Sequence, residues 1–324
     1  MTAERRVRVA LIGAGNMANN VHYPSLAEFP DVEMVGLCDL VEEKLHATAD
    51  KFAIEKRYSD YRLMLEETQP EAVYILMPPN QLYDIAVDCL EAGLHLFLEK
   101  PPGITTHQII WLAKWAEKNG VQGMVGFNRR YIPLMRHCRD LVVAHGGPIH
   151  QAVATFYKWM DEEMHPYYRG AVDILTSDCV HAVDTLRFLG GEVDRLASSV
   201  KTLGQNYDMA FNALLEFENG ATGILMGNWR TGGRMHQFEM HARGISAFVN
   251  PDFEAKINRD GALFVETIDS KEFAGSDQNY KYYGFWNQAR HFIDCVKAGT
   301  EPETSFPDAI KTMELVDRIY ASRI

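Results

Sequence analysis

Cysteine is scarce in this chain, with five among 324 residues. The five are odd in number and far apart, and none of them has the short paired spacing of a zinc site. We therefore expect no disulfide framework and no metal, and thiols that stay reduced are typical of a cytoplasmic protein. The cysteines are Cys38, Cys89, Cys138, Cys179 and Cys295.

Long apolar runs and an excess of positive charge are missing as well. No segment reaches the ~18 continuous apolar residues that a membrane helix needs. Lysine and arginine number 32 against 44 aspartate and glutamate, which gives a net charge of −12. Because an acidic surface repels phosphate backbones and anionic lipid, we expect neither nucleic acid nor a membrane as a partner. The apolar fraction of 47% is that of a globular protein, and the length of 324 residues favours two domains.

The first 128 residues alternate short apolar runs with segments of helical period. Several of the runs are almost continuously apolar, which is typical of strands buried on both faces. Strands that alternate with helices predict a doubly wound parallel sheet, so we expect an α/β Rossmann domain over residues 1–128. The expected strands are 7–12, 34–38, 72–76, 94–98 and 122–127.

The pattern changes after residue 128. From about 197 to 273, strands follow one another with turn residues between them, and strands without intervening helices favour an antiparallel or mixed sheet. We therefore predict a second domain of the α+β class over residues 129–324. Its expected helices are about 131–145, 171–189, 282–298 and 308–321, with a further strand at 149–157.

A dinucleotide-binding pattern follows the first strand. Residues 13–18 read Gly-Ala-Gly-Asn-Met-Ala, a G-x-G-x-x-A turn that opens a helix. Gly13 allows the tight turn, Gly15 lets the backbone approach a pyrophosphate, and Ala18 permits close packing of the helix on the strand. Asp39 follows the second strand, where a carboxylate binds a ribose 2′-hydroxyl and repels a 2′-phosphate, so NAD is favoured over NADP. The alternative is a glycine turn that binds nothing.

Two further loops belong to the same edge of the sheet, where ligands bind in open α/β folds. One is Met-Pro-Pro-Asn at 77–80, and the other begins with Glu99 and Lys100. Pro101 restricts Lys100 to extended conformations, and a cis bond between them would aim the lysine side chain. The alternative is a solvated strand end. The candidate cofactor-binding residues are Gly13, Gly15, Asn16, Met17, Asp39, Pro79, Asn80, Glu99, Lys100 and Asn128.

Motifs spread over nearly the whole chain resemble those of the Gfo/Idh/MocA oxidoreductases, the family of glucose–fructose oxidoreductase and myo-inositol dehydrogenase. The resemblance rests on GAGNMA at 13–18, CDL at 38–40, PPN at 78–80, AGLHLFLEKP at 92–101, GFNRRY at 126–131 and HAVDTLRFLGG at 181–191. It implies a Rossmann domain followed by a domain with an open-faced, mostly antiparallel sheet. It also implies NAD-dependent hydride transfer to or from a sugar, cyclitol or sugar derivative, and a homodimer or homotetramer formed through the open sheet.

The resemblance also assigns roles to individual residues. Lys100 matches the family lysine that contacts both the nicotinamide side and the substrate, and His181 matches the histidine that often serves as acid/base. The family often has an aspartate four residues before that histidine, whereas this chain has Ser177 there and Asp178 next to it. Asp178, His181 and Asp184 are three residues apart and share one helix face. Either Asp178 replaces the usual carboxylate, or Ser177 performs a weaker version of its role.

Hydride transfer from an alcohol needs a group that accepts the hydroxyl proton. Histidine suits this step because its ordinary pKa of ~6.5 lies near working pH, and a general base contributes ~10²–10⁴-fold to the rate. We hypothesise that His181 accepts the proton, Lys100 stabilises the developing alkoxide, and Asp178 orients the imidazole. The alternative is that these helix residues are only structural.

Residues near the domain junction are further candidates. Arg129 and Arg130 suit a substrate anion or hydroxyl groups, or equally a salt bridge between domains. Tyr157 belongs to an aromatic group that suits a sugar. Two other functions stay open, a glycosidase of the same family that uses NAD transiently and a regulator that binds the cofactor without turnover. The candidate substrate-binding residues are Lys100, Arg130, Tyr157, Ser177, Asp178 and His181.

Overall fold

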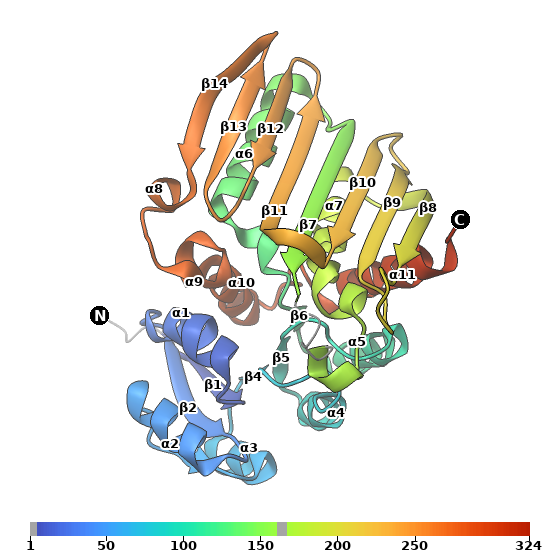
Figure 1. Cartoon of the computed structure of the whole chain (residues 1–324). Coiled ribbons are helices and arrows are strands. Elements are labelled where there is room, and N and C mark those ends of the chain that lie inside the picture. The colour runs from blue at the N-terminus through green and yellow to red at the C-terminus, as the bar shows by residue number, and fades with distance from the viewer. Residues whose placement is uncertain (1–4, 161–166) are drawn as a thin grey trace. The chain divides into compact units, whose positions relative to one another are not determined.

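The computed structural model describes residues 5–160 and 167–324, which form two compact units (Figure 1). Unit 1 consists of the described residues up to Gly126 together with Phe285–Ile310. Unit 2 consists of the described residues of 127–284 together with Lys311–Ile324. All of 129–324 was expected to form the second domain, but residues 285–310 pack with unit 1.

Unit 1 contains a parallel sheet in the order β3-β2-β1-β4-β5-β6. This is the doubly wound order of the Rossmann fold, which confirms the expected fold class. All residues of β4 are buried, because helices cover both faces of the sheet. The short strand β3 was not expected, since two residues are too few to show a period. The strands are β1 (Val7–Ile12), β2 (Val32–Cys38), β3 (Arg57–Tyr58), β4 (Ala72–Ile75), β5 (His95–Leu98) and β6 (Gly123–Val125).

The helices of unit 1 follow from their sequence patterns. In α5, Ile109, Leu112 and Ala116 recur at helical spacing and are buried on one side. At the start of α3, the Asp60 carboxylate caps the helix by accepting a hydrogen bond from the backbone N–H of Arg62 at 2.8 Å. The helices are η1 (Ala18–His22), α1 (Tyr23–Ala27), α2 (Glu42–Lys51), α3 (Tyr61–Thr68), α4 (Tyr83–Glu91), α5 (Thr106–Asn119) and α10 (Phe285–Ala298).

Helix α10 packs in unit 1 because one side of it is aromatic. Phe292 lies edge-on to Tyr74 of β4 and to Phe97 of β5, with ring centroids 5.6 and 5.8 Å away. Phe285 meets the ring of His22 at 5.6 Å in the same way. These partners lie far from α10 in the sequence, so no local pattern could have predicted this pairing. The following helix, α11 (Phe306–Ala321), begins in unit 1 and ends in unit 2.

Unit 2 is built on a sheet in the order β14-β13-β12-β11-β7-β10-β9-β8. All neighbouring strands are antiparallel except β7 and β10, which are parallel, so the expected mostly antiparallel sheet is confirmed. The strands are β7 (Gln151–Trp159), β8 (Val193–Lys201), β9 (Ala210–Phe217), β10 (Thr222–Asn228), β11 (Arg230–Ala242), β12 (Ile245–Val249), β13 (Glu254–Arg259) and β14 (Ala262–Asp269).

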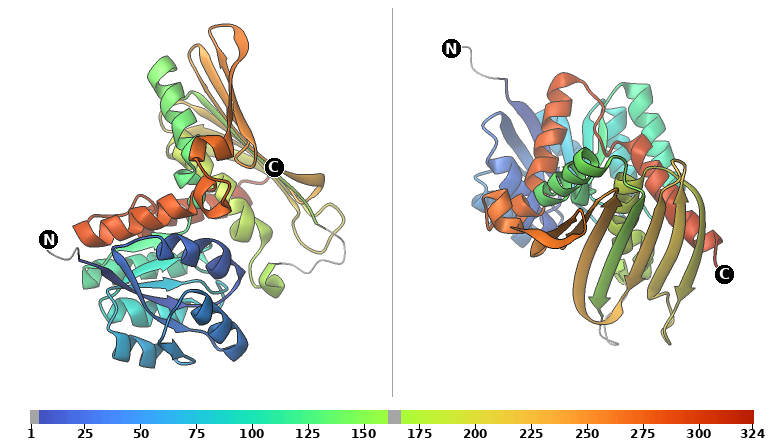
Figure 2. Two further views of the ribbon diagram at one scale, coloured as in Figure 1. Left: turned by 90° about the vertical axis from the view of Figure 1, so that its left-hand side faces the viewer. Right: turned by 90° about the horizontal axis from the view of Figure 1, so that it is seen from above.

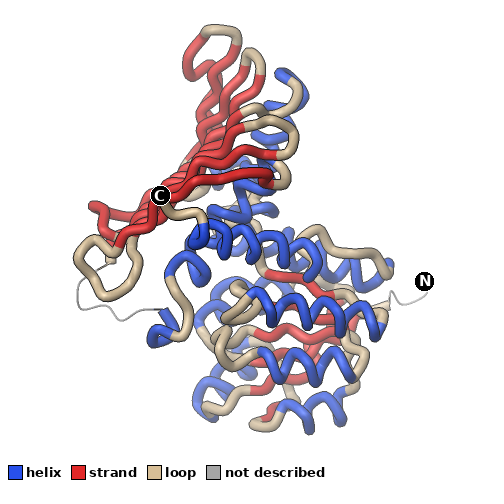
Figure 3. Tube along the Cα trace, turned by 90° about the vertical axis from the view of Figure 1, so that its right-hand side faces the viewer, coloured by secondary structure: helices blue, strands red, loops and turns tan. Residues whose placement is uncertain are grey.

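One face of this sheet is open. On the other face, helix α6 packs against β11 and β12, and helix α7 packs against β7 and β10. In β10 and β12 buried residues alternate with half-buried ones, and no described helix of unit 2 covers the open face (Figures 2 and 3). The helices of unit 2 are η2 (Asn128–Tyr131), α6 (Pro133–Gly146), η3 (Tyr167–Gly170), η4 (Leu175–Cys179), α7 (Val180–Gly190), α8 (Ser270–Ala274) and α9 (Asn279–Tyr282).

No helix in the described part of the chain combines the length and the apolar character that crossing a bilayer requires.

Candidate active site

The glycine turn lies at the carboxyl end of β1 in unit 1. Gly13 has a φ of +105°, and a Cβ atom there would lie 2.6 Å from the carbonyl oxygen of Leu76, so the fold itself requires glycine. At Gly15 an added Cβ would meet nothing within 4 Å. Asn16 and Met17 beside it are exposed. The space above Gly15 is therefore open to a ligand that needs close contact with the backbone.

The carboxylate of Asp39 is held beside this turn. Its Oδ2 atom accepts a hydrogen bond from the backbone N–H of Ala14 at 2.7 Å, and its Oδ1 atom accepts one from Val41 at 2.8 Å. Leu40, which follows, is 80% exposed. A fixed carboxylate next to an exposed apolar side chain suits the ribose and adenine of a dinucleotide. When bound, the nicotinamide dinucleotide would supply the hydride acceptor, and these residues would hold its adenosine end.

The loops after β4 and β5 lie at the same edge of the sheet. Pro79 is buried and Asn80 is exposed. The Glu99 carboxylate pairs with the Nε2 atom of buried His22 at 2.7 Å and accepts a hydrogen bond from the backbone N–H of Lys100 at 3.1 Å. The Lys100–Pro101 peptide bond is cis. Glu99 thus connects the helix that follows the glycine turn to the strand end that carries Lys100. His22 was not identified from the sequence, because its partner lies 77 positions away.

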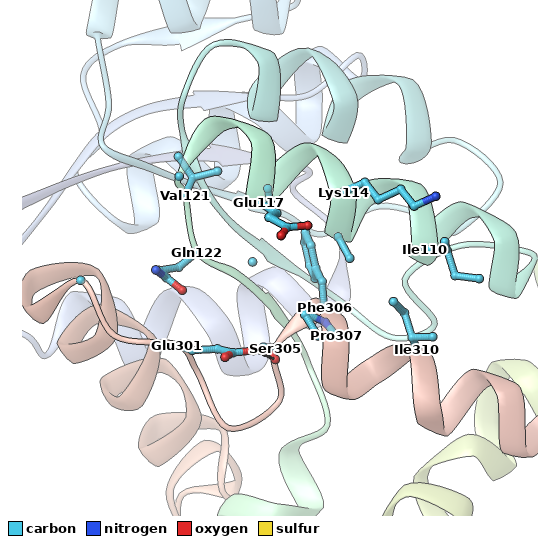
Figure 4. Close-up of a pocket in the computed structure, with 15 residues that line it drawn as sticks. Ile110, Lys114, Glu117, Val121, Gln122, Glu301, Ser305, Phe306, Pro307 and Ile310 are labelled. Carbon is cyan, nitrogen blue, oxygen red and sulfur yellow. Dashed lines mark hydrogen bonds between the residues drawn. The ribbon is translucent and has the colours of Figure 1, made fainter.

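A cavity of about 680 Å³ lies elsewhere in unit 1 (Figure 4). It is lined by α5, by the segment 120–123 that enters β6, and by residues 299–310, with Glu117, Glu301 and Phe306 among its side chains. Because these residues precede β6, the cavity is at the amino edge of the parallel sheet. The glycine turn and Asp39 are at the carboxyl edge, so this cavity is separate from the cofactor candidates.

In unit 2, His181 and Asp178 belong to two consecutive helical segments, α7 and η4, and both are buried. The Asp178 carboxylate forms an ion pair with Lys158 of β7 and accepts a hydrogen bond from the Tyr167 hydroxyl at 2.7 Å. Burial, and after it the Asp178 charge, raises the pKa of Tyr167, so this hydroxyl keeps its proton as a donor. Ser177 is buried beside Asp178.

Arg130 and Asp184 form a buried ion pair within unit 2. The Nε atom of Arg130 donates to Asp184 at 2.8 Å, Nη2 donates to the second carboxylate oxygen at 2.5 Å, and Thr312 donates to the same carboxylate at 2.9 Å. Arg130 was expected to contact substrate or to bridge the two domains. Its carboxylate partner instead comes from α7 of its own unit, so the pair fastens the helix that carries His181.

Arg129 is placed quite differently from its neighbour. Its Nη1 atom donates to the Asn128 side-chain oxygen at 2.7 Å and lies 3.4 Å from Nε2 of His181. The Asn128 amide in turn donates to the carbonyl oxygen of Tyr283 at 2.8 Å. Asn128 was expected to bind the cofactor, but both ends of its side-chain amide make bonds within unit 2.

Strand β7 divides the aromatic candidates between the two faces of the sheet. Phe156 stacks on the ring of His236 at 3.7 Å, and Lys158 reaches Asp178 on the helical side. Since successive side chains of a strand point to opposite faces, Tyr157 lies on the open face, where its hydroxyl is 3.9 Å from the sulfur of Met226. Tyr157 therefore lies on the opposite face of the sheet from Lys158 and Asp178.

His236, whose ring stacks on Phe156 and lies near Arg129, was not identified from the sequence. It is fully buried, and burial lowers the pKa of its imidazole far below the ordinary value, which Arg129, Arg234 and Lys158 lower further. The ring is therefore neutral. A lone histidine within a strand gives no sign of this role, because Phe156, Arg129 and Tyr283, which surround its ring, lie far from it in the sequence.

Comparison with known proteins places this arrangement in a family. The family model described as "Oxidoreductase family, NAD-binding Rossmann fold" matches residues 7–127, and the Gfo/Idh/MocA C-terminal domain matches residues 139–245. The chain belongs to the Gfo/Idh/MocA oxidoreductases. The family resemblance drawn from the sequence is thereby confirmed, and with it the expectation of an oxidoreductase with an NAD-binding domain.

Relatives within the Gfo/Idh/MocA family include sugar and cyclitol dehydrogenases. D-apiose dehydrogenase of Paraburkholderia graminis is 28% identical over 99% of this chain and 88% of that protein. Myo-inositol 2-dehydrogenase of Thermotoga maritima is 22% identical over 93% of this chain and 92% of that protein. The structure of levoglucosan dehydrogenase in complex with NADH and levoglucosan matches with a TM-score of 0.85 at 21% identity, covering 98% of this chain and 97% of that one.

Proposed function

We propose that this protein is an NAD-dependent dehydrogenase that transfers hydride between nicotinamide and a secondary alcohol or carbonyl of a sugar, cyclitol or sugar derivative. The observation that carries the proposal is the carboxylate of Asp39 held at 2.7 Å by the backbone of the glycine turn, in a family with an NAD-binding Rossmann fold. The named activities of the relatives, which act on apiose and myo-inositol, support this class of substrate. The proposed division of labour is cofactor binding by residues 1–128 and substrate binding by 129–324.

The proposed catalytic residues are His181, Lys100 and Asp178. His181 accepts the hydroxyl proton, and Lys100 donates a hydrogen bond to the same oxygen and stabilises its developing negative charge. Asp178, which lies one helical turn before His181, orients the imidazole, and Ser177 is buried beside it at the position where the family often has an aspartate. Lys158 and Tyr167 hold this carboxylate in place through the ion pair and the hydrogen bond described above.

Two of the candidate residues take other roles in this proposal. Arg130 acts through its ion pair with Asp184, which positions α7, and Asn128 positions Arg129. Tyr157 is left out of the substrate site because it lies on the open face of the sheet.

The test is NADH formation, followed at 340 nm with a panel of aldoses, polyols and sugar acids. With the best substrate of the panel, we expect His181→Ala and Lys100→Met each to lower kcat by ~10²–10⁴-fold, because each removes a group that acts on the reacting oxygen. His150→Ala and Lys44→Met, which change exposed side chains, are the matched controls and should leave kcat unchanged. Near wild-type turnover in both site variants would refute the assignment.

We further propose a homodimer or homotetramer formed through the open face of the unit 2 sheet, with neither nucleic acid nor a membrane as a partner. Apolar side chains on that face, Leu214 and Met235 among them, support an interface. A cytoplasmic location is proposed as well, and it is supported by five cysteines that are all free and buried.

A further inference from the structure

Arg129 is a buried cation without a carboxylate partner among the described residues. It is 7% exposed, and its Nε atom is buried with no hydrogen-bond partner. Its guanidinium carbon lies 4.8 Å from the ring centroid of Tyr283 and 6.0 Å from that of Phe156. Its Nη1 atom is directed at Asn128 and His181. The Nε edge of the guanidinium is thus the part left for another acceptor.

The cations around Arg129 are all compensated. Lys158 pairs with Asp178, Arg130 with Asp184, and Arg234 with Asp252 at 3.1 Å. His236, whose pKa is held low, adds no charge. Among the described residues, one positive charge, that of Arg129, therefore has no counter-charge, and it lies beside the proposed catalytic histidine. A buried charge is costly unless it is paired, so this arrangement indicates that Arg129 pairs with an anion from beyond the described residues, which a bound substrate would supply.

We propose that Arg129 binds a carboxylate of the substrate, and hence that the substrate is a sugar acid rather than a neutral sugar. This inference rests on the proposed function, since it names the substrate of the same site. A guanidinium edge donates two parallel hydrogen bonds, which match the two oxygens of a carboxylate.

The carboxylate would also assist the proton transfer. The Nε2 atom of His181 lies 3.4 Å from Nη1 of Arg129, so a proton accepted by this imidazole would place two positive charges side by side, and they would repel each other. An anion paired with Arg129 offsets this repulsion. Substrates without a carboxylate lack this compensation, so the preference for the acid should appear in kcat as well as in KM.

The decisive experiment compares matched pairs, D-glucuronate with D-glucose and D-galacturonate with D-galactose, in the presence of NAD. The wild type should favour the acid in kcat/KM by ~10–100-fold, which is the effect of one hydrogen-bonded charge pair. Arg129→Gln should bring this ratio close to one, and Arg129→Lys should keep part of it. Arg139→Gln, which removes a half-buried guanidinium that stacks on Phe188, is the matched control and should keep the full ratio.

The outcomes separate this inference from the proposed function. Oxidation of the neutral sugars with equal or greater efficiency, or an acid preference that survives Arg129→Gln, overturns the inference and leaves the dehydrogenase proposal standing. If no member of the panel is oxidised, calorimetry measures the binding of glucuronate and of glucose to the NADH complex. The inference requires that the wild type binds glucuronate more tightly than glucose and that Arg129→Gln abolishes this difference. Binding of NADH by the variant serves as the check that it is folded.

Discussion

At the residue scale, two pairs of residues of the same type, close together in the chain, have opposite roles. Gly13 and Gly15 belong to one turn, yet the first is required by the fold and the second leaves open space. Arg129 and Arg130 are adjacent in the chain, yet one is ion-paired with Asp184 and the other has no carboxylate partner in the described part of the molecule. Residue type alone therefore does not reveal the role, and the surrounding atoms decide it.

The glycine pair gives a prediction that separates stability from binding. Gly15→Val should leave the free energy of unfolding within ~0.5 kcal/mol of wild type, because its side chain enters open space. It should weaken NAD binding by ~10–100-fold, because the side chain occupies the place of the pyrophosphate. Gly13→Ala should instead lower the free energy of unfolding by ~1–3 kcal/mol, since φ is +105° there. Urea unfolding and calorimetric titration with NAD measure both quantities, and tight NAD binding by Gly15→Val would contradict the proposed cofactor site.

At the element scale, α10 is joined to unit 1 by charge as well as by aromatic packing. The Asp31 carboxylate, just before β2, accepts hydrogen bonds from Arg290 at 2.7 Å and from Lys297 at 2.8 Å. The hydrogen bond from Arg290, with help from Lys297, lowers the pKa of Asp31 to about 2. The carboxylate is buried, so solvent screens this interaction less than it screens a surface pair.

This cluster predicts a pH-dependent contribution to stability. Because the pKa of Asp31 is lower in the folded state than its ordinary value of ~3.9, its stabilising effect is present above that value and is lost as the pH falls towards 2. Asp31→Asn should therefore lower the free energy of unfolding by ~1–3 kcal/mol at pH 7, and by progressively less below pH ~4. Asp294→Asn, which removes an exposed partner of Arg290, is the control and should change it by less than ~0.5 kcal/mol. If Asp31→Asn lowered the free energy of unfolding equally at all pH values, this account would be ruled out.

At the scale of the whole molecule, the open sheet face raises the question of assembly. Leu214 is 58% exposed, and the strand register places it beside Ala197 and Ile224 on the same face. An apolar row across an uncovered sheet is typical of a surface that another subunit covers.

A charge in this row should prevent assembly. We expect Leu214→Glu to convert the proposed dimer or tetramer to a smaller species, because a buried carboxylate without a partner is costly. Leu63→Glu on α3, where the leucine is 46% exposed, is the matched control and should not change the mass. Light scattering coupled to size exclusion measures the outcome. A wild-type monomer, or an unchanged assembly of Leu214→Glu, would exclude this interface.

The sequence by itself determined the features that depend on neighbouring residues. Apolar runs, helical periods and turn residues predicted five of the parallel strands and the antiparallel region, and the G-x-G-x-x-A turn with Asp39 predicted the dinucleotide site. These signals are local, because hydrogen-bonding period and turn geometry involve residues a few positions apart.

Only the tertiary structure decided which distant residues meet. In it, α10 packs with unit 1, Arg130 pairs with Asp184, Tyr157 lies on the open face and His236 stacks on Phe156. It also left Arg129 without a carboxylate in the described chain. Such pairings depend on burial and on charge compensation between segments far apart in sequence, and a linear pattern contains no measure of either.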